Sequence, residues 1–170
     1  MAISTSAGAR IFIGQTVNVT TIEAMSAEVA LAFWEAIAEE DWTEIEEVES
    51  ISQFGDTSQV ANFVSLGKRR VRKLKTTKDA QTTTLTVGRD PLDPGQMKLS
   101  AAQKTDFNYA FRVIYNDARD ENYSPSTDYF GGMVLSEPVT VGAATDVTKR
   151  TFEVGINTAI YEDPSDPTGS

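Results

Sequence analysis

Charged residues that could support chemistry fall into two runs of opposite sign. An acidic segment, residues 39–49, carries seven carboxylates, and a basic run, residues 68–78, carries seven of the fifteen lysines and arginines. The carboxylates belong to Glu39, Glu40, Asp41, Glu44, Glu46, Glu47 and Glu49. The basic residues are Lys68, Arg69, Arg70, Arg72, Lys73, Lys75 and Lys78. Solvation and mutual repulsion explain such carboxylates, and no apolar pocket signature selects a pair for acid–base catalysis.

Other routes to catalysis are also missing from the sequence. The chain has neither histidine nor cysteine, which hydrolase triads, most zinc sites and most general bases near neutral pH require. Gly131 and Gly132 lack the following helix and the spacing of a phosphate loop. Asp117, Asp120 and Glu121 lack the ligand register and glycine of a calcium loop. We therefore expect no catalytic residues, no cofactor, no metal site and no enzymatic activity.

Three interpretations of the segregated charge are open. The two runs could pair across strands of one subunit, which would contribute well under ~1 kcal/mol per exposed pair. The basic run could instead meet the acidic surface of another subunit and specify a head-to-tail contact. Nucleic-acid binding ranks last, because the net charge is −10 and only Val71 and Leu74 provide large side chains within the run.

Length and composition indicate one ordinary domain. With 170 residues, 40% hydrophobic and 24% charged, and no linker rich in proline, glycine or serine, the chain can bury one sizeable core. No segment approaches the ~20 apolar residues that span a bilayer, and the N-terminus shows no basic region before an apolar run. The sequence therefore indicates neither a membrane span nor a signal peptide.

The elements around residues 82–115 are predicted most clearly. Residues 82–88 and 107–115 alternate apolar and polar positions, which is typical of strands with one buried face. Between them Asp93 can cap a helix, Pro94 suits its first position, and Gln96 can complete a capping box. This helix should end near Lys104.

The remaining elements are predicted from weaker patterns. Residues 11–13 form a short apolar strand candidate, and residues 17–22 alternate as a second strand. Residues 25–42 contain an amphipathic helix, and residues 129–139 and 151–160 resume the strand pattern. Phe33 and Trp34 in that helix could be interface anchors or could pack under the sheet. Residues 42–51 place apolar side chains three apart, which we interpret as one long strand with a bulge.

Several motifs along the chain together resemble one protein family. Residues 79–81 precede a threonine-rich strand, and residues 89–90, 93–96 and 101–102 then precede an aromatic strand. This order of motifs resembles that of the major tail tube proteins of long-tailed (siphovirus-type) bacteriophages. Residues 42–45 are similar to the segment that precedes the long stacking loop of those proteins. Residues 129–134 are similar to their penultimate strand. The resemblance covers roughly residues 11–161, and it depends on the order and spacing of the motifs.

This resemblance implies a mainly β fold: an antiparallel β-sandwich or half-barrel with one flanking helix and a long protruding loop or hairpin arm. It implies one domain over residues 1–170, with a flexible N-terminal segment (1–9), a stacking arm (53–78) and a C-terminal tail (162–170). The arm's expected assembly contacts are Phe54, Phe63, Val64, Leu66, Lys68, Arg69, Arg70, Arg72 and Lys73, with the acidic segment as the complementary surface.

The function that the resemblance implies is structural. Subunits would form rings, taken by analogy as hexamers, whose stacking builds the virion tail tube, assembled in the host cytoplasm, through which DNA is ejected. Partners would be other copies, tail terminator, tape-measure and baseplate proteins, and DNA that passes without specific binding, with no membrane. The overall acidity would suit a lumen that repels phosphate. The alternatives are a monomeric β-sandwich that binds carbohydrate or protein on a virion or cell surface, and a baseplate or head-completion protein.

Overall fold

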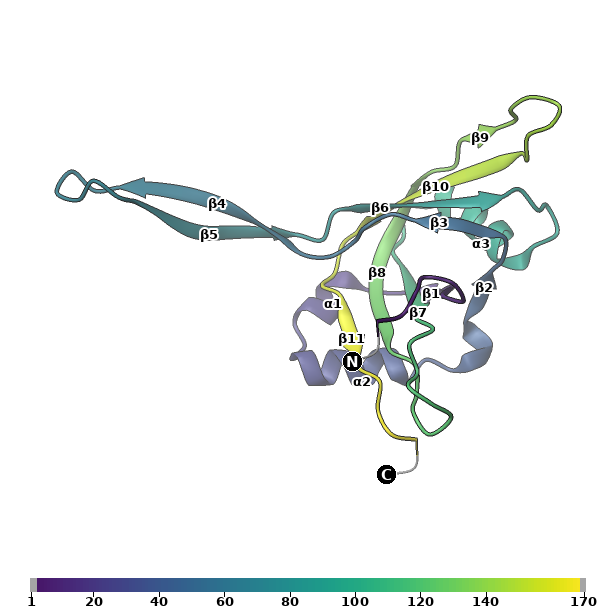
Figure 1. Cartoon of the computed structure of the whole chain (residues 1–170), viewed down its shortest axis with the longest axis horizontal. Coiled ribbons are helices and arrows are strands. Elements are labelled where there is room, and N and C mark those ends of the chain that lie inside the picture. Colours follow the sequence, from purple (N-terminus) through teal and green to yellow (C-terminus); the bar gives the residue numbers. More distant parts are fainter. Residues whose placement is uncertain (1–2, 169–170) are drawn as a thin grey trace.

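The computed structural model of the chain describes residues 3–168, so the ends of the predicted N-terminal segment and C-terminal tail, residues 1–2 and 169–170, lie outside it. Figure 1 shows a rounded body from which a two-stranded arm projects. The helices are α1 (Val19–Glu23), α2 (Ala27–Glu35), the 3-10 turn η1 (Glu39–Asp41) and α3 (Pro94–Gln103). The strands are β1 (Arg10–Thr16), β2 (Thr43–Ile45), β3 (Val48–Ile51), β4 (Thr57–Val64), β5 (Val71–Asp79), β6 (Thr82–Gly88), β7 (Tyr109–Ile114), β8 (Thr127–Ser136), β9 (Val139–Thr140), β10 (Lys149–Ile156) and β11 (Tyr161–Asp163).

The body is built on one strongly curved antiparallel sheet with the order β2-β1-β7-β8-β10-β6-β3. Strand β8 belongs to two half-sheets, because β7 pairs with its residues 127–132 and β10 with its residues 132–136. The first half-sheet contains β2, β1, β7, the start of β8 and β11; the second contains the end of β8, β9, β10, β6 and β3. The expected mainly β, antiparallel fold is confirmed.

The core lies between the two half-sheets. Strand β10 faces it with Phe152, Val154 and Ile156, as the alternation in the sequence predicts. The stacked rings of Phe111 and Phe130, 5.4 Å apart, join β7 to β8 across the centre of this cluster. This close packing of large side chains fixes how the two half-sheets lie against each other.

Residues 42–51 form two strands, so the prediction of one long bulged strand is wrong. Strand β2 pairs with β1 at one end of the sheet, whereas β3 pairs with β6 at the other end. Only Glu46 and Glu47 connect them, and Glu47 has a φ of 56° at this turn. The three-residue spacing of apolar side chains arises because the chain changes half-sheets here.

Helix α3 begins and ends close to the predicted positions. Asp93 accepts hydrogen bonds from the backbone N–H groups of Gly95 and Gln96, which satisfies two free donors at the helix start. The predicted capping box is wrong, because the buried Gln96 side chain accepts from the N–H of Asp90 and donates to the carbonyl of Gly88. Gln96 thereby ties α3 to the end of β6.

We expect Gly95→Ala to lower the free energy of unfolding by about 3 kcal/mol, because an inserted methyl group would overpack this contact. A Cβ at Gly95 would lie 2.2 Å from the carbonyl oxygen of Glu44 in β2. Gly67→Ala is the matched control, since nothing lies within 4 Å of its Cβ position. Chemical denaturation of both variants measures the difference, and equal stabilities would contradict this packing.

Two helices cover the outer face of the first half-sheet. The fully buried Trp34 of α2 packs with Ile22 of α1 and with Tyr129 of β8 in a second apolar cluster. The expected helix in residues 25–42 is confirmed, and Trp34 packs under the sheet rather than serving as an exposed anchor. Residues 17–22 do not form the predicted strand, because Asn18 caps α1 by accepting a hydrogen bond from the N–H of Thr21.

Residues near the C-terminus are more ordered than the sequence suggests. Strand β11 pairs with β8 through Tyr161 and Tyr129, and Pro167 lies opposite Tyr123 in an isolated bridge. In the described part of the chain, no helix is long and apolar enough to cross a bilayer.

Candidate assembly interface

The most conspicuous feature of the molecule is the hairpin arm, defined as residues 57–79. Its strands β4 and β5 form a separate two-stranded sheet, and within the described part of the chain they pair only with each other. Figure 1 shows this hairpin extending far beyond the body. Of the expected alternatives, a protruding loop or a hairpin arm, the structure has the hairpin, in which residues 57–64 form a regular strand. A two-stranded hairpin with no supporting core is marginally stable in water.

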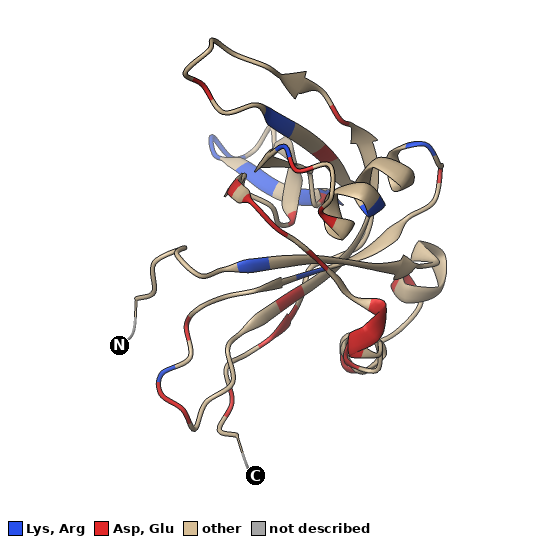
Figure 2. Ribbon diagram, turned by 90° about the vertical axis from the view of Figure 1, so that its right-hand side faces the viewer, with Lys and Arg blue, Asp and Glu red and all other residues tan. Residues whose placement is uncertain are grey.

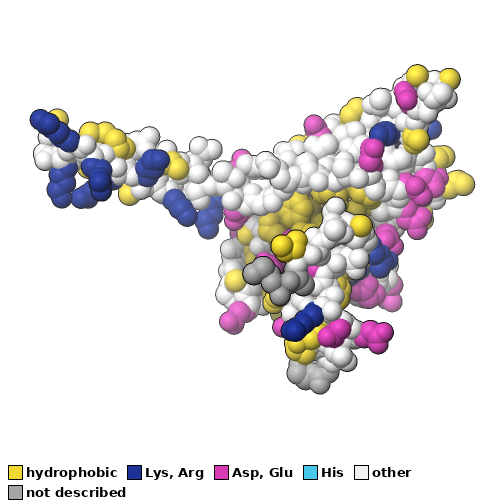
Figure 3. Space-filling model, in the orientation of Figure 1, with side chains coloured by type: hydrophobic (Ala, Val, Ile, Leu, Met, Phe, Trp, Pro, Cys, Tyr) yellow, Lys and Arg dark blue, Asp and Glu magenta, His cyan; other side chains and the backbone are white. Residues whose placement is uncertain are grey.

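The two faces of the hairpin arm differ in charge. Residues directly opposite each other in an antiparallel pair lie on the same face, and the register pairs Asn62 with Lys73 and Val60 with Lys75. A register shift then pairs Ser58 with Lys78. Lys75 and Lys78 are three residues apart, which would place them on opposite faces of a regular strand. The register shift compensates for this spacing, so Lys73, Lys75 and Lys78 lie on one face, which we call the lysine face. Figure 3 shows basic side chains at the tip of the hairpin and along its lower edge.

Apolar side chains of the hairpin arm are exposed to an unusual degree. Leu66 at the tip is fully exposed, and five further large side chains are at least half exposed: Val60, Phe63, Val64, Val71 and Leu74. Contiguous exposed apolar residues on a projecting element mark a contact surface, because leaving them in water is unfavourable. Phe63, Val64 and Leu66 therefore lie where a partner could cover them.

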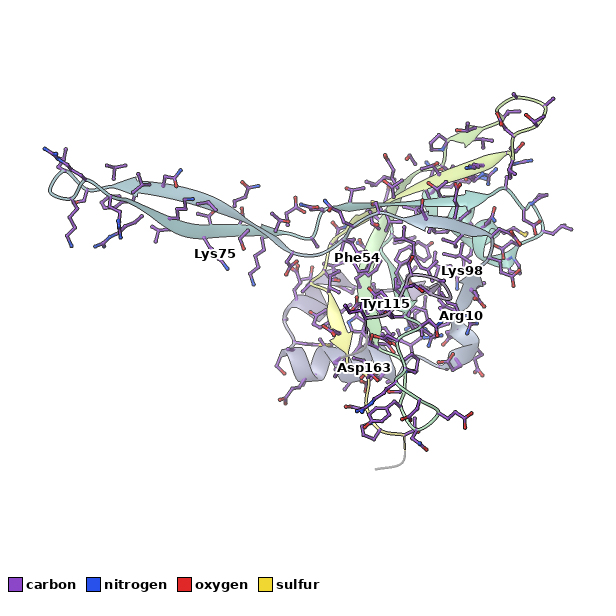
Figure 4. All side chains as sticks on the ribbon, viewed as in Figure 1. Arg10, Phe54, Lys75, Lys98, Tyr115 and Asp163 are labelled. Atoms are coloured by element: carbon purple, nitrogen blue, oxygen red, sulfur yellow. The ribbon has the colours of Figure 1, made fainter. Side chains whose placement is uncertain are left out.

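Phe54, one of the predicted interface residues, does not belong to the hairpin arm. It is half-buried at the base of the arm, and its ring centroid lies 5.5 Å from that of Phe130. In Figure 4 it lies at the start of the arm, above Tyr115, whereas Lys75 lies far out on the arm. Phe54 thus anchors the arm to the core of its own subunit.

Three carboxylates of the acidic segment are already paired within the body. Glu44 accepts two hydrogen bonds from Arg10, at 2.6 and 2.5 Å, and Glu49 forms an ion pair of 2.5 Å with Lys149. Arg112 donates to both oxygens of Glu39, at 2.6 and 3.0 Å. These hydrogen bonds hold the pKa values of the Glu39 and Glu44 carboxyls below their usual range.

Arg112 is a buried cation that the sequence patterns did not single out, and it positions part of the acidic segment. Its side chain is only 6% exposed, and its guanidinium lies 4.4 Å from the ring centre of Phe12 and 4.8 Å from that of Trp42. Because the aromatic rings and Glu39 fix its position, Arg112 holds η1 against the first half-sheet. The one available signal was a charged residue inside the otherwise apolar strand β7.

The other four carboxylates of the acidic segment remain free to bind a partner. Glu40, Asp41, Glu46 and Glu47 are exposed, and none forms an ion pair with another described residue. Figure 2, seen from the end opposite the hairpin arm, shows acidic residues along a helical turn and the segment beside it. These four residues, which we call the free acidic patch, keep their charge available on the surface.

The structure keeps the basic run and the acidic segment apart. Strand β5 pairs with β4, so the proposal that the two runs pair across strands of one subunit is wrong. Within residues 3–168, none of the seven basic side chains of the run forms an ion pair. Figure 3 shows dark blue side chains on the arm and magenta side chains concentrated around the body. One subunit therefore presents unpaired charge of opposite sign at two separate places.

A half-buried acidic group elsewhere, Asp128, gives the protein a pH-dependent contact. Burial raises the pKa of the Asp128 carboxyl, whose Oδ2 accepts a hydrogen bond of 2.5 Å from the Tyr115 hydroxyl. The nearby Glu162 and Asp117 raise it further. A carboxyl whose pKa is raised on folding favours the folded state only when it is protonated, so its charged form at pH 7 costs stability.

We expect Asp128→Asn to increase the free energy of unfolding at pH 7, by less than about 1 kcal/mol because the site is partly hydrated. The amide oxygen can still accept the Tyr115 hydrogen bond. The gain should shrink as the pH falls through the raised pKa of the folded state and vanish near about pH 3, below the unfolded pKa of about 3.9, where the wild-type carboxyl is protonated in both states. Thermal melting at both pH values measures it, with the exposed Asp106→Asn as control; a gain that persists at low pH would contradict the assignment.

Comparison with known proteins places these features in a family. A family model described as phage tail tube protein matches residues 15–152, which is most of the chain. No curated protein sequence matches the chain.

Solved structures with the same fold were also found. The tail tube of SPP1 superimposes with a TM-score of 0.61 at 10% identity, covering 94% of this chain and 78% of that chain. The sheath/tube terminator of an extracellular contractile injection system, PVC, gives 0.66 at 10% identity, covering 96% and 99%. A protein of the anti-feeding prophage (AFP) baseplate gives 0.59 at 12% identity, covering 95% and 97%. At these identities the likeness concerns the fold.

Proposed function

The chain belongs to the phage tail tube protein family and is a structural component of the virion tail, and from this premise we propose that its rings stack through the hairpin arm. The basic, apolar hairpin arm of each subunit extends to a subunit of the adjacent ring and binds there beside the free acidic patch. The observation that carries this proposal is an arm whose apolar side chains are exposed and whose cationic side chains form no ion pair with any residue among 3–168.

Head-to-tail geometry supports this contact. The hairpin arm projects from one end of the molecule, and acidic residues gather toward the opposite end. A surface that is not self-complementary repeats without closing on itself, so translation of one subunit onto the next produces a polymer. Opposite charges on the two surfaces favour the correct register and speed the encounter, while the exposed apolar side chains of the arm contribute most of the affinity.

Ring formation within a layer would use the free edges of the second half-sheet. Among the strands of the described residues, β3 has β6 as its only neighbour, and at the other end of the half-sheet β9 pairs only with β10. Unpaired sheet edges invite further strand pairing, and a closed ring satisfies them without unlimited aggregation. By family analogy the ring is a hexamer.

Further partners follow from the same premise. The fold is shared with a tube terminator and a baseplate protein, which supports contacts with such proteins at the two ends of the tube. A tape-measure protein during assembly and DNA during ejection would occupy the lumen without specific binding. In this role the chain acts mechanically, with no catalytic step.

The assembly state of the purified protein tests this proposal. We expect negative-stain microscopy and sedimentation at rising concentration to show rings that stack into tubes. Single rings that never stack would favour a baseplate or head-completion role. A monomer at every concentration would overturn the proposal and favour a surface binding module.

A further inference from the structure

A second group of exposed apolar side chains lies at the end of the body opposite the hairpin arm. Leu92 is 83% exposed, Met97 58% and Val147 68%, and we call these three residues the apolar corner. Leu92 directly precedes Asp93, the cap of α3, and Met97 lies one turn into the helix. A contact between these two positions often steadies the start of a helix. Here most of the surface of both side chains nevertheless meets water in the free subunit.

The parts of the apolar corner are held together by the backbone. The N–H of Arg89 donates to the carbonyl of Thr148 at 2.9 Å, which places the loop before α3 beside Val147. Arg89 and Asp90 also lie in this loop, and their opposite charges add no net charge to it. Figure 1 shows the loop and α3 on the far side of the body from the hairpin arm. One subunit therefore cannot bring its own arm to its own apolar corner.

The free acidic patch borders the apolar corner. The N–H of Glu46 donates to Oδ2 of Asp93 at 3.2 Å, and the carbonyl of Glu47 accepts a hydrogen bond of 2.8 Å from the N–H of Gly88. These bonds hold the turn between β2 and β3 against the end of β6 and the start of α3. In Figure 3, hydrophobic and acidic side chains lie side by side at this end of the body. The corner thus presents apolar surface next to negative charge.

The lysine face of the hairpin arm has the matching composition. Val64 and Val71 lie opposite each other, and Lys73 is two residues from Val71. Val60 lies opposite Lys75. Because alternate residues of a strand and directly opposed residues of a pair share one face, these valines lie on the lysine face. All three valines are at least half exposed, so the lysine face presents apolar surface next to positive charge.

We propose that the apolar corner is the seat that receives the lysine face of a second copy of the chain in the adjacent ring; the inference rests on the proposed stacking. The valines of the arm cover the apolar corner, while its lysines meet Glu46 and Glu47 at the border. Burial of the apolar side chains provides most of the affinity, and the charges set the orientation. A second copy fits this seat because every subunit carries both surfaces at opposite ends.

Removing the apolar contact tests the seat without changing any charge. In L92S/M97Q both altered side chains are exposed, so the subunit should stay folded by circular dichroism. Sedimentation across a concentration series should show that tubes need about tenfold more subunit or higher, because two central apolar contacts are lost. The control V29Q/F107S removes two exposed apolar side chains elsewhere and should assemble like the natural chain. Normal assembly of L92S/M97Q, or an equal loss in the control, would overturn the inference.

Cross-linking tests whether the two surfaces touch, because the natural chain contains no cysteine. Cysteine is small and apolar, so V71C/L92C should still form tubes. A short bismaleimide should join these subunits into a ladder on a denaturing gel when they are in tubes, and should leave dilute free subunits monomeric. Tubes of the control V29C/V71C should give no ladder.

The outcomes separate the seat from the stacking itself. Tubes of V71C/L92C that give no ladder, or a ladder of equal strength from V29C/V71C, would show that the arm binds elsewhere, and would overturn the seat while the proposed stacking stands. A natural chain that forms no tubes would overturn both.

Discussion

Reversing the lysine face with the triple change K73E/K75E/K78E is expected to weaken tube formation strongly while the subunit stays folded. Each exposed ion pair contributes roughly 0.2–1 kcal/mol, and reversal replaces attraction with repulsion, so the three changes together should cost about 3 kcal/mol per contact. That loss raises the subunit concentration needed for assembly about a hundredfold. Sedimentation across a concentration series measures it.

The matched control applies the same change of net charge elsewhere on the surface. Arg89, Lys104 and Arg119 are exposed and lie outside the hairpin arm, so R89E/K104E/R119E should still form tubes. Adding E40K/E46K/E47K to the lysine-face variant reverses both partners and should restore assembly. Equal loss in the control would show that net charge alone governs association, and failure of the compensating changes would exclude the free acidic patch as the partner.

Shortening the hairpin arm is expected to have the second large effect. If residues 60–75 are replaced by Asn-Gly, a favoured two-residue hairpin turn, the pair of Ser58 and Lys78 remains to close the strands. The removed residues pair only within the arm, so the body's free energy of unfolding should change by less than about 1 kcal/mol. Rings should persist and stacked tubes should be absent in the microscope.

Two results would contradict this expectation. Tubes that form normally from the shortened chain would show that stacking uses another surface. A large loss of body stability would show that the arm contributes to the core, and the variant would then not test stacking. A replacement confined to the tip, which exchanges Leu66 for serine, serves as the milder companion, since this side chain contacts only solvent in the subunit.

The sequence predicted those parts of the fold in which local signals agree. The cap at Asp93, the proline at the first helical position and the alternation in β6 and β10 each determine structure within a few residues. The hydrophobic pattern of β10 needed no knowledge of its partners, because one of its faces is buried along the whole strand.

Other elements depended on contacts that no local pattern encodes. The turn at Glu46 and Glu47 divides β2 from β3, and only the pairing of these strands with opposite ends of the sheet explains it. The pairing of Glu39 with Arg112 joins residues far apart in the chain. Likewise the lysine face follows from a register shift between β4 and β5, which spacing in β5 alone does not reveal.

The most direct test of the account is amide hydrogen exchange of residues 57–79 in free subunits and in assembled tubes. An isolated hairpin without a core opens readily, so these amides should exchange rapidly in the subunit. Contact with the adjacent ring should protect them strongly in tubes, while core strands such as β10 should be protected in both states. If the amides of the hairpin arm are equally protected in free subunits and tubes, or remain unprotected in tubes, the arm does not join the rings.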